Sequence, residues 1–133
     1  MTALAIGADD RMGARLLYTI GYEKALLKDV VSTLAAAIED AGMRYVHFQA
    51  LGTPPEGRRA GKRREWDRFW GIVDEKLARP EAELALQEAG EIAKAAPSCL
   101  LCYEADWQIC HRRRISEILA QRYGFAVSHL AVG

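Results

Sequence analysis

A thiol, an imidazole and a run of guanidinium groups occur close together in residues 100–114, which read LLCYEADWQICHRRR. Cys110 falls at the predicted start of a helix, where unpaired backbone N–H groups and the positive end of the helix dipole stabilise a thiolate. His111 and Arg112 would lower the pKa of this thiol further, which makes Cys110 a candidate nucleophile. The same position would also suit a buried, inert cysteine that only fills space.

The residues that follow Cys110 indicate the binding of an anion. The helix N-terminus and the Arg112 guanidinium could together hold a phosphate or a carboxylate group. His111 could be a general base, a metal ligand or an anion donor, or could simply bond to the backbone. At about 100° per residue, Arg112 can reach the edge of a sheet, whereas Arg113 and Arg114 turn toward solvent.

Cys102 and Glu104 are two residues apart in the strand predicted before this helix, so both side chains point to the same face of the strand. Glu104 ends the strand, where it could act as an acid or base, orient His111, or form a plain ion pair with Arg112. Cys99 and Cys102 spell C-x-x-C, but residues three apart in a strand point to opposite faces. We therefore do not interpret these two cysteines as a redox pair.

Zinc binding is an alternative chemistry for these side chains, because Cys102, Cys110, His111 and His47 could supply soft ligands. Their spacing matches no standard closed zinc site, so we assign none of them as a metal ligand. The cofactor is therefore unknown, and zinc is the one candidate.

Apolar runs and helical periodicities predict strands that alternate with helices. Strands are expected at about 16–20, 43–48, 99–104 and 125–130, and helices at about 24–41, 66–77, 81–96 and 110–123. Such an alternation favours right-handed crossovers and parallel strands. The predicted fold class is α/β, a three-layer sandwich with a mostly parallel sheet of four or five strands and helices on both faces.

Ligands of such sheets bind beyond the carboxyl ends of the strands. This rule selects residues 21–23 after the first strand, residues 47–52 after the second and residues 104–112 after the third. Tyr22 and His47 each follow an apolar strand and could line one cleft, although His47 would also fit a satisfied histidine at a strand end. The predicted substrate-binding residues are Arg112, Tyr22, His47, Gly21 and Cys102.

Residues 49–63 contain three glycines and two prolines and are predicted to form a mobile loop. Five positive charges in residues 58–64 could make this loop a lid that grips a phosphorylated ligand or a nucleic-acid backbone. A solvated surface explains the same charges. The residues concerned are Arg58, Arg59, Lys62, Arg63 and Arg64.

The overall composition excludes a strong electrostatic field around the whole protein. Among 133 residues, 18 are Lys or Arg and 18 are Asp or Glu, so no net charge would draw in nucleic acid or an anionic membrane. No stretch approaches the roughly 18 apolar residues of a membrane helix, and the N-terminus lacks the basic start of a secretory signal. The three cysteines fit a reducing compartment. We expect a single α/β domain over residues 1–133, no membrane contact and a cytoplasmic location, with the oligomeric state unknown.

Several short motifs resemble those of a family, the domain of unknown function 488. A strand ending in T-I-G-Y occurs at residues 19–22, and Y-x-H followed by L-G at residues 45–52. The most specific motif is L-L-C-x-E followed by C-H-R, at residues 100–112, and the resemblance covers about residues 16–130. It implies a small α/β fold with no established activity, and a characteristic cluster made of Tyr22, His47, Cys102, Glu104, Cys110, His111 and Arg112.

The sequence departs from this family's pattern in one place. Family members carry, after the first helix, another strand ending in D-V-R, then a loop and another helix. Residues 32–48, STLAAAIEDAGMRYVHF, pass directly from what looks like the first helix to the end of that later helix. Either a strand has been lost between about Leu34 and Glu39, or the sequence joins residues across a missing segment. We favour the second, because losing a central parallel strand would open the sheet.

These features predict an enzyme of unknown reaction with an anionic substrate, such as a nucleotide or a nucleic-acid end. Cys110 would be the nucleophile or anion anchor, His111 and Glu104 the acid/base pair, and Arg112 the charge clamp. One alternative is a non-catalytic module that binds an anion or nucleic acid in the same cleft. The other is a metal-binding protein with Cys and His ligands.

Overall fold

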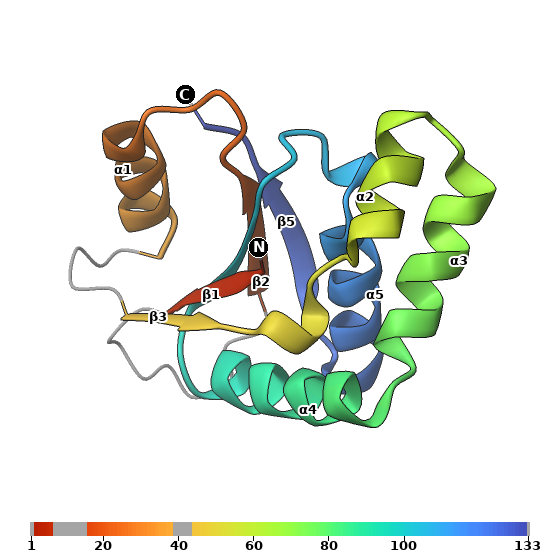
Figure 1. Cartoon of the computed structure of the whole chain (residues 1–133). Helices are drawn as coiled ribbons and strands as arrows, with labels where there is room; N and C mark the ends of the chain where they lie inside the picture. The colour runs from red at the N-terminus through yellow and green to blue at the C-terminus, as the bar shows by residue number, and fades with distance from the viewer. Residues whose placement is uncertain (1, 7–15, 39–43, 133) are drawn as a thin grey trace.

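The computed structural model describes residues 2–6, 16–38 and 44–132 (Figure 1). Within them, five strands form one sheet in the order β3-β1-β4-β2-β5. The strands are β1 (Ala3–Ile6), β2 (Leu16–Gly21), β3 (Arg44–His47), β4 (Ser98–Cys102) and β5 (Ala126–Leu130). The helices are α1 (Leu27–Ile38), α2 (Pro55–Lys62), α3 (Trp66–Leu77), α4 (Pro80–Ala95) and α5 (His111–Tyr123), with short 3-10 segments η1 (Gln49–Leu51) and η2 (Trp107–Ile109). The predicted α/β class is confirmed.

The sheet is mixed, and the prediction of a mostly parallel sheet is not confirmed. β2 pairs in parallel with β4 and β5, whereas β1 pairs antiparallel with both β3 and β4. β1 was not expected, because four apolar residues near a chain end give too short a pattern to distinguish a strand. Because β1 runs antiparallel to both of its neighbours, β3 and β4, these two strands run in the same direction as β2 and β5. The strands β2, β3, β4 and β5 therefore still end at the same edge. The edge predicted to carry the site therefore exists, and Thr2, just before β1, lies at it as well.

Helices contact both faces of this sheet (Figure 1). On one face, Val30 and Leu34 of α1 pack against Ile20 and Cys99. On the other face, the larger part of the core joins residues of β1, β2 and β4 to residues of α2, α3, α4 and α5. The sheet therefore places alternate residues of one strand in different surroundings, with Cys99 on the α1 face.

The sequence predicted a loop over residues 49–63, and this prediction was wrong. These residues contain η1 and α2. Pro55 stands in the first turn of α2, where a missing N–H costs nothing, so the proline begins the helix and does not break it. Gly57 lies against the side chains of Thr53 and Ile72, where a Cβ atom would be too close. Glycine and proline therefore start this helix and allow it to pack against α3.

The interruption expected between about Leu34 and Glu39 falls partly outside the described residues and stays a prediction. Within the described residues, the strand that the family pattern places after the first helix is absent. Residues 39–43, where part of this difference falls, lie outside the described residues. The neighbours of β4 are β2 on one side and β1 on the other, so β1 closes the sheet beside β4.

None of the helices in residues 16–38 and 44–132 has the length and apolarity needed to cross a membrane.

Candidate functional site

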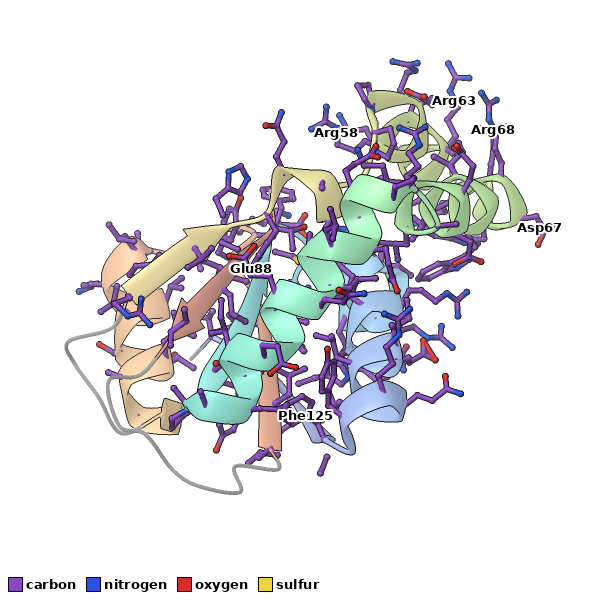
Figure 2. All side chains as sticks on the ribbon, turned by 90° about the horizontal axis from the view of Figure 1, so that it is seen from below. Arg58, Arg63, Asp67, Arg68, Glu88 and Phe125 are labelled. Carbon is purple, nitrogen blue, oxygen red and sulfur yellow. The ribbon has the colours of Figure 1, made fainter. Side chains whose placement is uncertain are left out.

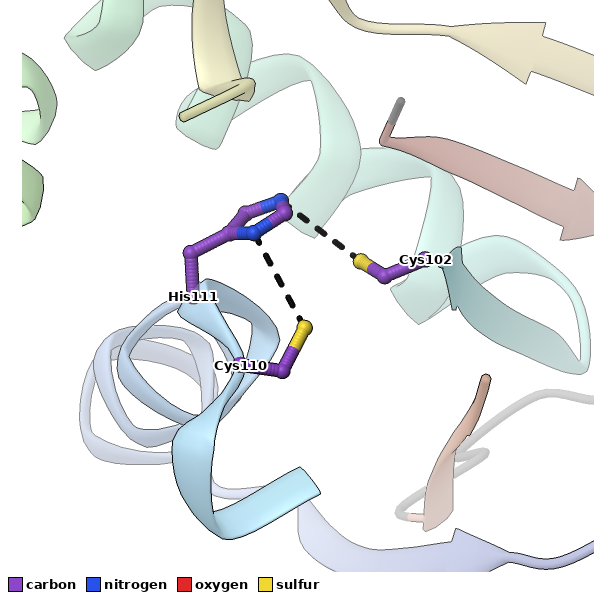
Figure 3. Close-up of side chains that lie close together, drawn as sticks. All are labelled: Cys102, Cys110 and His111. Atoms are coloured by element: carbon purple, nitrogen blue, oxygen red, sulfur yellow. Dashed lines mark hydrogen bonds between the residues drawn. The ribbon is translucent and has the colours of Figure 1, made fainter. Parts of the chain in front are cut away.

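Three of the predicted site residues meet on the α5 face of the sheet, at the edge where β4 ends. Cys102 is the last residue of β4, Cys110 caps the N-terminus of α5, and His111 is the first residue of α5. All three are buried, and their sulfur and nitrogen atoms lie within 4.8 Å of one another. Figure 3 shows both sulfur atoms pointing at the imidazole ring. We call Cys102, Cys110 and His111 the thiol–imidazole cluster.

Cys110 occupies the position predicted from the sequence, immediately before the first turn of α5. Its backbone is extended, and its Sγ atom accepts a hydrogen bond from the backbone N–H of Arg112 at 3.5 Å. The sulfur thus does what a serine or aspartate oxygen does at other helix N-termini. Nδ1 of His111 lies 3.8 Å from the same sulfur. The backbone N–H of Arg112, a ring nitrogen of His111 and the positive end of the helix dipole therefore face the Cys110 sulfur.

These surroundings lower the pKa of the Cys110 thiol to about 4, chiefly through the neighbouring Cys102 thiol and against the opposing effect of burial. The His111 ring and the Arg112 N–H lower this pKa further. Burial raises the pKa of Cys102 well above the ordinary value. The two thiols therefore differ in acidity: the surroundings favour the thiolate of Cys110 and the protonated form of Cys102.

Thr2 completes the surroundings of His111. Nε2 of His111 lies 3.6 Å from Cys102 Sγ and is hydrogen-bonded to the Thr2 hydroxyl, which is fully buried. Sequence reasoning missed Thr2, because its place depends on β1 lying antiparallel beside β4. The alternation of Thr2 with Leu4 and Ile6 would have given its face once β1 was recognised.

Arg112 is completely buried and contacts only protein acceptors in the described part of the chain. Its guanidinium donates to the main-chain carbonyls of Glu104 at 2.5 Å and Ala105 at 3.2 Å, and Nε donates to the Thr19 hydroxyl at 3.2 Å. No salt bridge joins it to the Glu104 carboxylate among these residues, although one was considered. Arg112 therefore holds the segment after β4 against β2 and α5.

Glu104 lies two residues beyond the end of β4 and is partly buried. Burial raises the pKa of its carboxyl, and the negative charge of Cys110 raises it further, while His111 opposes both. Glu104 is therefore within electrostatic reach of the thiol–imidazole cluster.

Gly21 and Tyr22 lie beside the end of β4. Gly21 pairs with Cys102, and a Cβ atom on Gly21 would overlap the main-chain carbonyl of Glu104. The backbone N–H of Tyr22 donates to the Cys102 carbonyl at 3.1 Å. The Tyr22 ring, however, packs on the α1 face and meets Tyr103 edge-on, so it is on the opposite face from the cluster. Both residues support the backbone near the cluster.

His47 ends β3 and is exposed, and β1 separates β3 from β4. It is therefore at the predicted edge but is not among the donors that converge on the cluster.

A polar network that the sequence analysis did not find continues from Arg112 to β5. The Thr19 hydroxyl accepts from Arg112 and lies 2.5 Å from Nδ1 of His129, so its proton is free to point at that nitrogen. Burial lowers the pKa of His129, with the Arg112 charge contributing, and Trp107 stacks on the imidazole at a centroid distance of 3.8 Å. Thr19 and His129 lie opposite each other on the neighbouring parallel strands β2 and β5. This pairing is the signal from which the sequence could have placed the two side chains together.

An open pocket of about 340 Å³ lies next to this region. It is lined in part by Gly21, which lies against the Glu104 carbonyl, and by Ala105, which follows Glu104 in the sequence. Residues of the α1 side of the sheet complete the lining. The cluster does not line this pocket. Cys110 is 1% exposed, so its sulfur reaches solvent only if neighbouring groups move.

The thiol–imidazole cluster is also the set of described residues that could hold a metal ion. Two thiolates and one imidazole would satisfy three positions of tetrahedral zinc and leave the fourth to another group. The fourth ligand considered from the sequence, His47, is not near them. The two sulfurs also approach different ring nitrogens, whereas one ion takes a single nitrogen from each imidazole. This arrangement is that of a hydrogen-bonded cluster.

Comparison with known proteins gives a family and nothing more. Domain of unknown function DUF488 matches residues 30–119, which is 90 of the 133 residues and includes the whole thiol–imidazole cluster together with His47, Glu104 and Arg112. No curated protein and no solved structure matches the chain significantly. With its late Cys-x-Glu and Cys-His-Arg motifs folded into one buried cluster, the chain belongs to the DUF488 family, a domain of unknown function.

Proposed function

We propose that this protein is an enzyme in which the Cys110 thiolate attacks a small substrate that carries a phosphate or carboxylate group. One observation carries the proposal: the Cys110 sulfur caps α5, lies 3.8 Å from the His111 ring and lies within 4.8 Å of the Cys102 sulfur. A structural cysteine needs none of these partners, and each of them favours the thiolate, which is the nucleophilic form.

The surrounding groups divide the work of such a reaction. The Cys110 sulfur would form a bond to the electrophilic atom of the substrate, and the bond to the leaving group would break. The Glu104 carboxyl, whose pKa is raised by burial, would donate a proton to that leaving group. His111 would hold the thiolate through Nδ1, and the N-terminus of α5 would attract the anionic group of the substrate.

Arg112 has a supporting role in this proposal and not the charge-clamp role first expected. Two of its hydrogen bonds fix the carbonyls of Glu104 and Ala105, and the third joins it to the Thr19 hydroxyl, so it positions the residue that carries the Glu104 carboxyl. Substrate access to the buried sulfur would come from movement of residues 103–109, most of which are exposed. A cytoplasmic location belongs to the proposal, because a reducing compartment keeps Cys102 and Cys110 as thiols.

The test is the pH dependence of iodoacetamide alkylation of each cysteine, read by mass spectrometry on native protein with chelator or with added zinc. The expected result is that the midpoint for Cys110 lies well below the roughly 8.5 of a free thiol. The midpoint is the informative quantity, because burial slows alkylation at every pH. Cys99, on the other face of the sheet, is the internal control, and burial raises its pKa.

A normal midpoint for Cys110 without metal would remove the nucleophile and leave a site that only binds anions. Protection of both Cys102 and Cys110 by stoichiometric zinc, with no protection of Cys99, would replace the enzyme by a metal-binding protein. A lowered midpoint that Cys110→Ser abolishes would support the proposal and direct substrate screens toward thiol chemistry.

A further inference from the structure

A second surface, far from the thiol–imidazole cluster in sequence, concentrates positive charge. It consists of α2, the turn after it and the first turn of α3, and we call it the basic hairpin. Figure 2 shows Arg58, Arg63 and Arg68 extending from it away from the rest of the molecule. All of its basic side chains are exposed, and they are Arg58, Arg59, Lys62, Arg63, Arg64 and Arg68.

The charge of the basic hairpin is local. The whole chain carries equal numbers of positive and negative residues, yet residues 55–68 hold six basic and three acidic ones, the latter being Glu56, Glu65 and Asp67. None of the six basic residues forms a salt bridge with another residue that the structure describes. By contrast, Arg79, Arg114 and Arg122 are each paired with a carboxylate. The hairpin cations are therefore available to an outside anion.

The two helices present these cations on a fixed frame. Ala60 and Phe69 are buried between them, and Gly61 lets the Phe69 ring approach α2 closely. The turn is closed by backbone hydrogen bonds from Arg64 to Gly61 and from Glu65 to Ala60. Arg64 has a φ of +58°, a conformation that usually selects glycine at a helix end. An arginine stands here in spite of that preference.

The chemistry of the surface selects the kind of partner. Five of the six cations are guanidinium groups, which bind phosphate through two parallel hydrogen bonds. No large hydrophobic side chain is exposed on the hairpin, whereas a peripheral membrane helix needs an apolar face to enter the lipid. α2 spans roughly 12 Å at about 1.5 Å per residue, a length over which duplex DNA presents several phosphates.

We propose that the basic hairpin binds the phosphodiester backbone of nucleic acid without reading its sequence. Binding of this kind places a nucleic acid next to the N-terminus of α5, since α3 is packed beside the first turns of α5 through Trp70 and Arg114. The proposal does not depend on the reactivity of Cys110, and the two are tested separately.

The test is fluorescence anisotropy of a labelled DNA duplex of about 20 base pairs, with the single strand and an RNA of the same sequence as further probes. Binding is expected at about 50 mM salt and should weaken steeply as salt rises, with about three phosphates neutralised. Arg58→Glu with Arg63→Glu should weaken it at least about tenfold. The matched control is Arg79→Glu with Arg122→Glu, which changes the net charge equally at paired sites elsewhere and should change affinity less than about twofold.

A further variant separates binding from folding. Arg64→Gly removes one cation and relieves the left-handed backbone, so it should weaken DNA binding while the protein unfolds at a higher urea concentration. Cys110→Ser should bind DNA as the wild type does, whatever its alkylation shows. Three results would each overturn the proposal: no salt-dependent binding, equal losses in the two double variants, or binding to vesicles of phosphatidylcholine and phosphatidylserine without binding to DNA or RNA.

Discussion

The sulfur of Cys102, at the end of β4, lies within 4.8 Å of the sulfur of Cys110, at the start of α5. The neighbouring Cys102 thiol is the largest cause of the low pKa of Cys110, whereas burial raises the pKa of Cys102 itself. A strand end and a helix N-terminus, joined by seven residues, thereby produce one acidic and one inert thiol.

Replacing Cys102 should therefore weaken the acidity of Cys110. In Cys102→Ala the neighbouring thiol is lost while the helix N-terminus and His111 remain, so the alkylation midpoint of Cys110 should rise by roughly one pH unit or more. Cys99→Ala is the matched control, because Cys99 lies on the α1 face and contributes nothing to the pKa of Cys110. An unchanged midpoint in Cys102→Ala would show that the two sulfurs do not interact.

The same low pKa predicts how stability depends on pH. The pKa of Cys110 is about 4 in the folded protein and about 8.5 in an unfolded chain. Between these values the unfolded chain holds a proton that the folded protein has lost, so this contribution to stability rises with pH and disappears as pH falls toward 4. The limiting slope for one such group is about 1.4 kcal/mol per pH unit.

Urea unfolding followed by tryptophan fluorescence, in reductant, at several pH values from about 5 to 8 measures this slope. Cys110→Ser should be less stable than the wild type by an amount that grows with pH across this window. Cys99→Ser, which also places a hydroxyl in the core, should lose a constant amount. Parallel curves for Cys110→Ser and Cys99→Ser would contradict a thiolate at position 110. Above about pH 9 the buried Cys102 should lower stability, because only the unfolded chain ionises it.

The cluster was largely predictable because local patterns place its members. Cys110 falls where an apolar strand gives way to helical periodicity, and the parity of a strand separates Cys99 from Cys102. Each of these inferences needs only the periods of a strand and a helix. They hold whatever the order of the strands in the sheet.

What could not be predicted depends on contacts between distant segments. Thr2 reaches His111 only because β1 inserts antiparallel beside β4, and this same insertion keeps His47 away from the cluster. Arg112 was expected to face a ligand, since its angle on the helix is right, but its length lets it reach main-chain carbonyls of the preceding segment. Sequence spacing gives the direction of a side chain and not the acceptor at its end.

Gly21 should not tolerate substitution, because there is no space for a side chain at this position, whereas there is space at Gly71. In Gly21→Ala the new methyl group would overlap the Glu104 carbonyl, which Arg112 also holds, so β2 and the segment after β4 must separate. We expect a loss of about 2–4 kcal/mol in the free energy of unfolding. Gly71→Ala is the control, because nothing lies within 4 Å of its Cβ position on α3, and it should gain about 1 kcal/mol from helix propensity. Urea unfolding of both variants gives the comparison, and equal stabilities would refute it.

Arg112→Lys tests whether Arg112 acts through its hydrogen bonds or through its charge. Lysine keeps the charge but cannot reach Thr19, Glu104 and Ala105 together, so the free energy of unfolding should fall by about 2–4 kcal/mol. The alkylation midpoint of Cys110 should change little, because the guanidinium charge is not among the causes of its low pKa. Arg113→Lys, at an exposed site on the same helix, is the control and should change stability by less than about 0.5 kcal/mol. If Arg112→Lys kept full stability but shifted the Cys110 midpoint upward, Arg112 would act as a charge beside the thiolate and not as a support for the backbone.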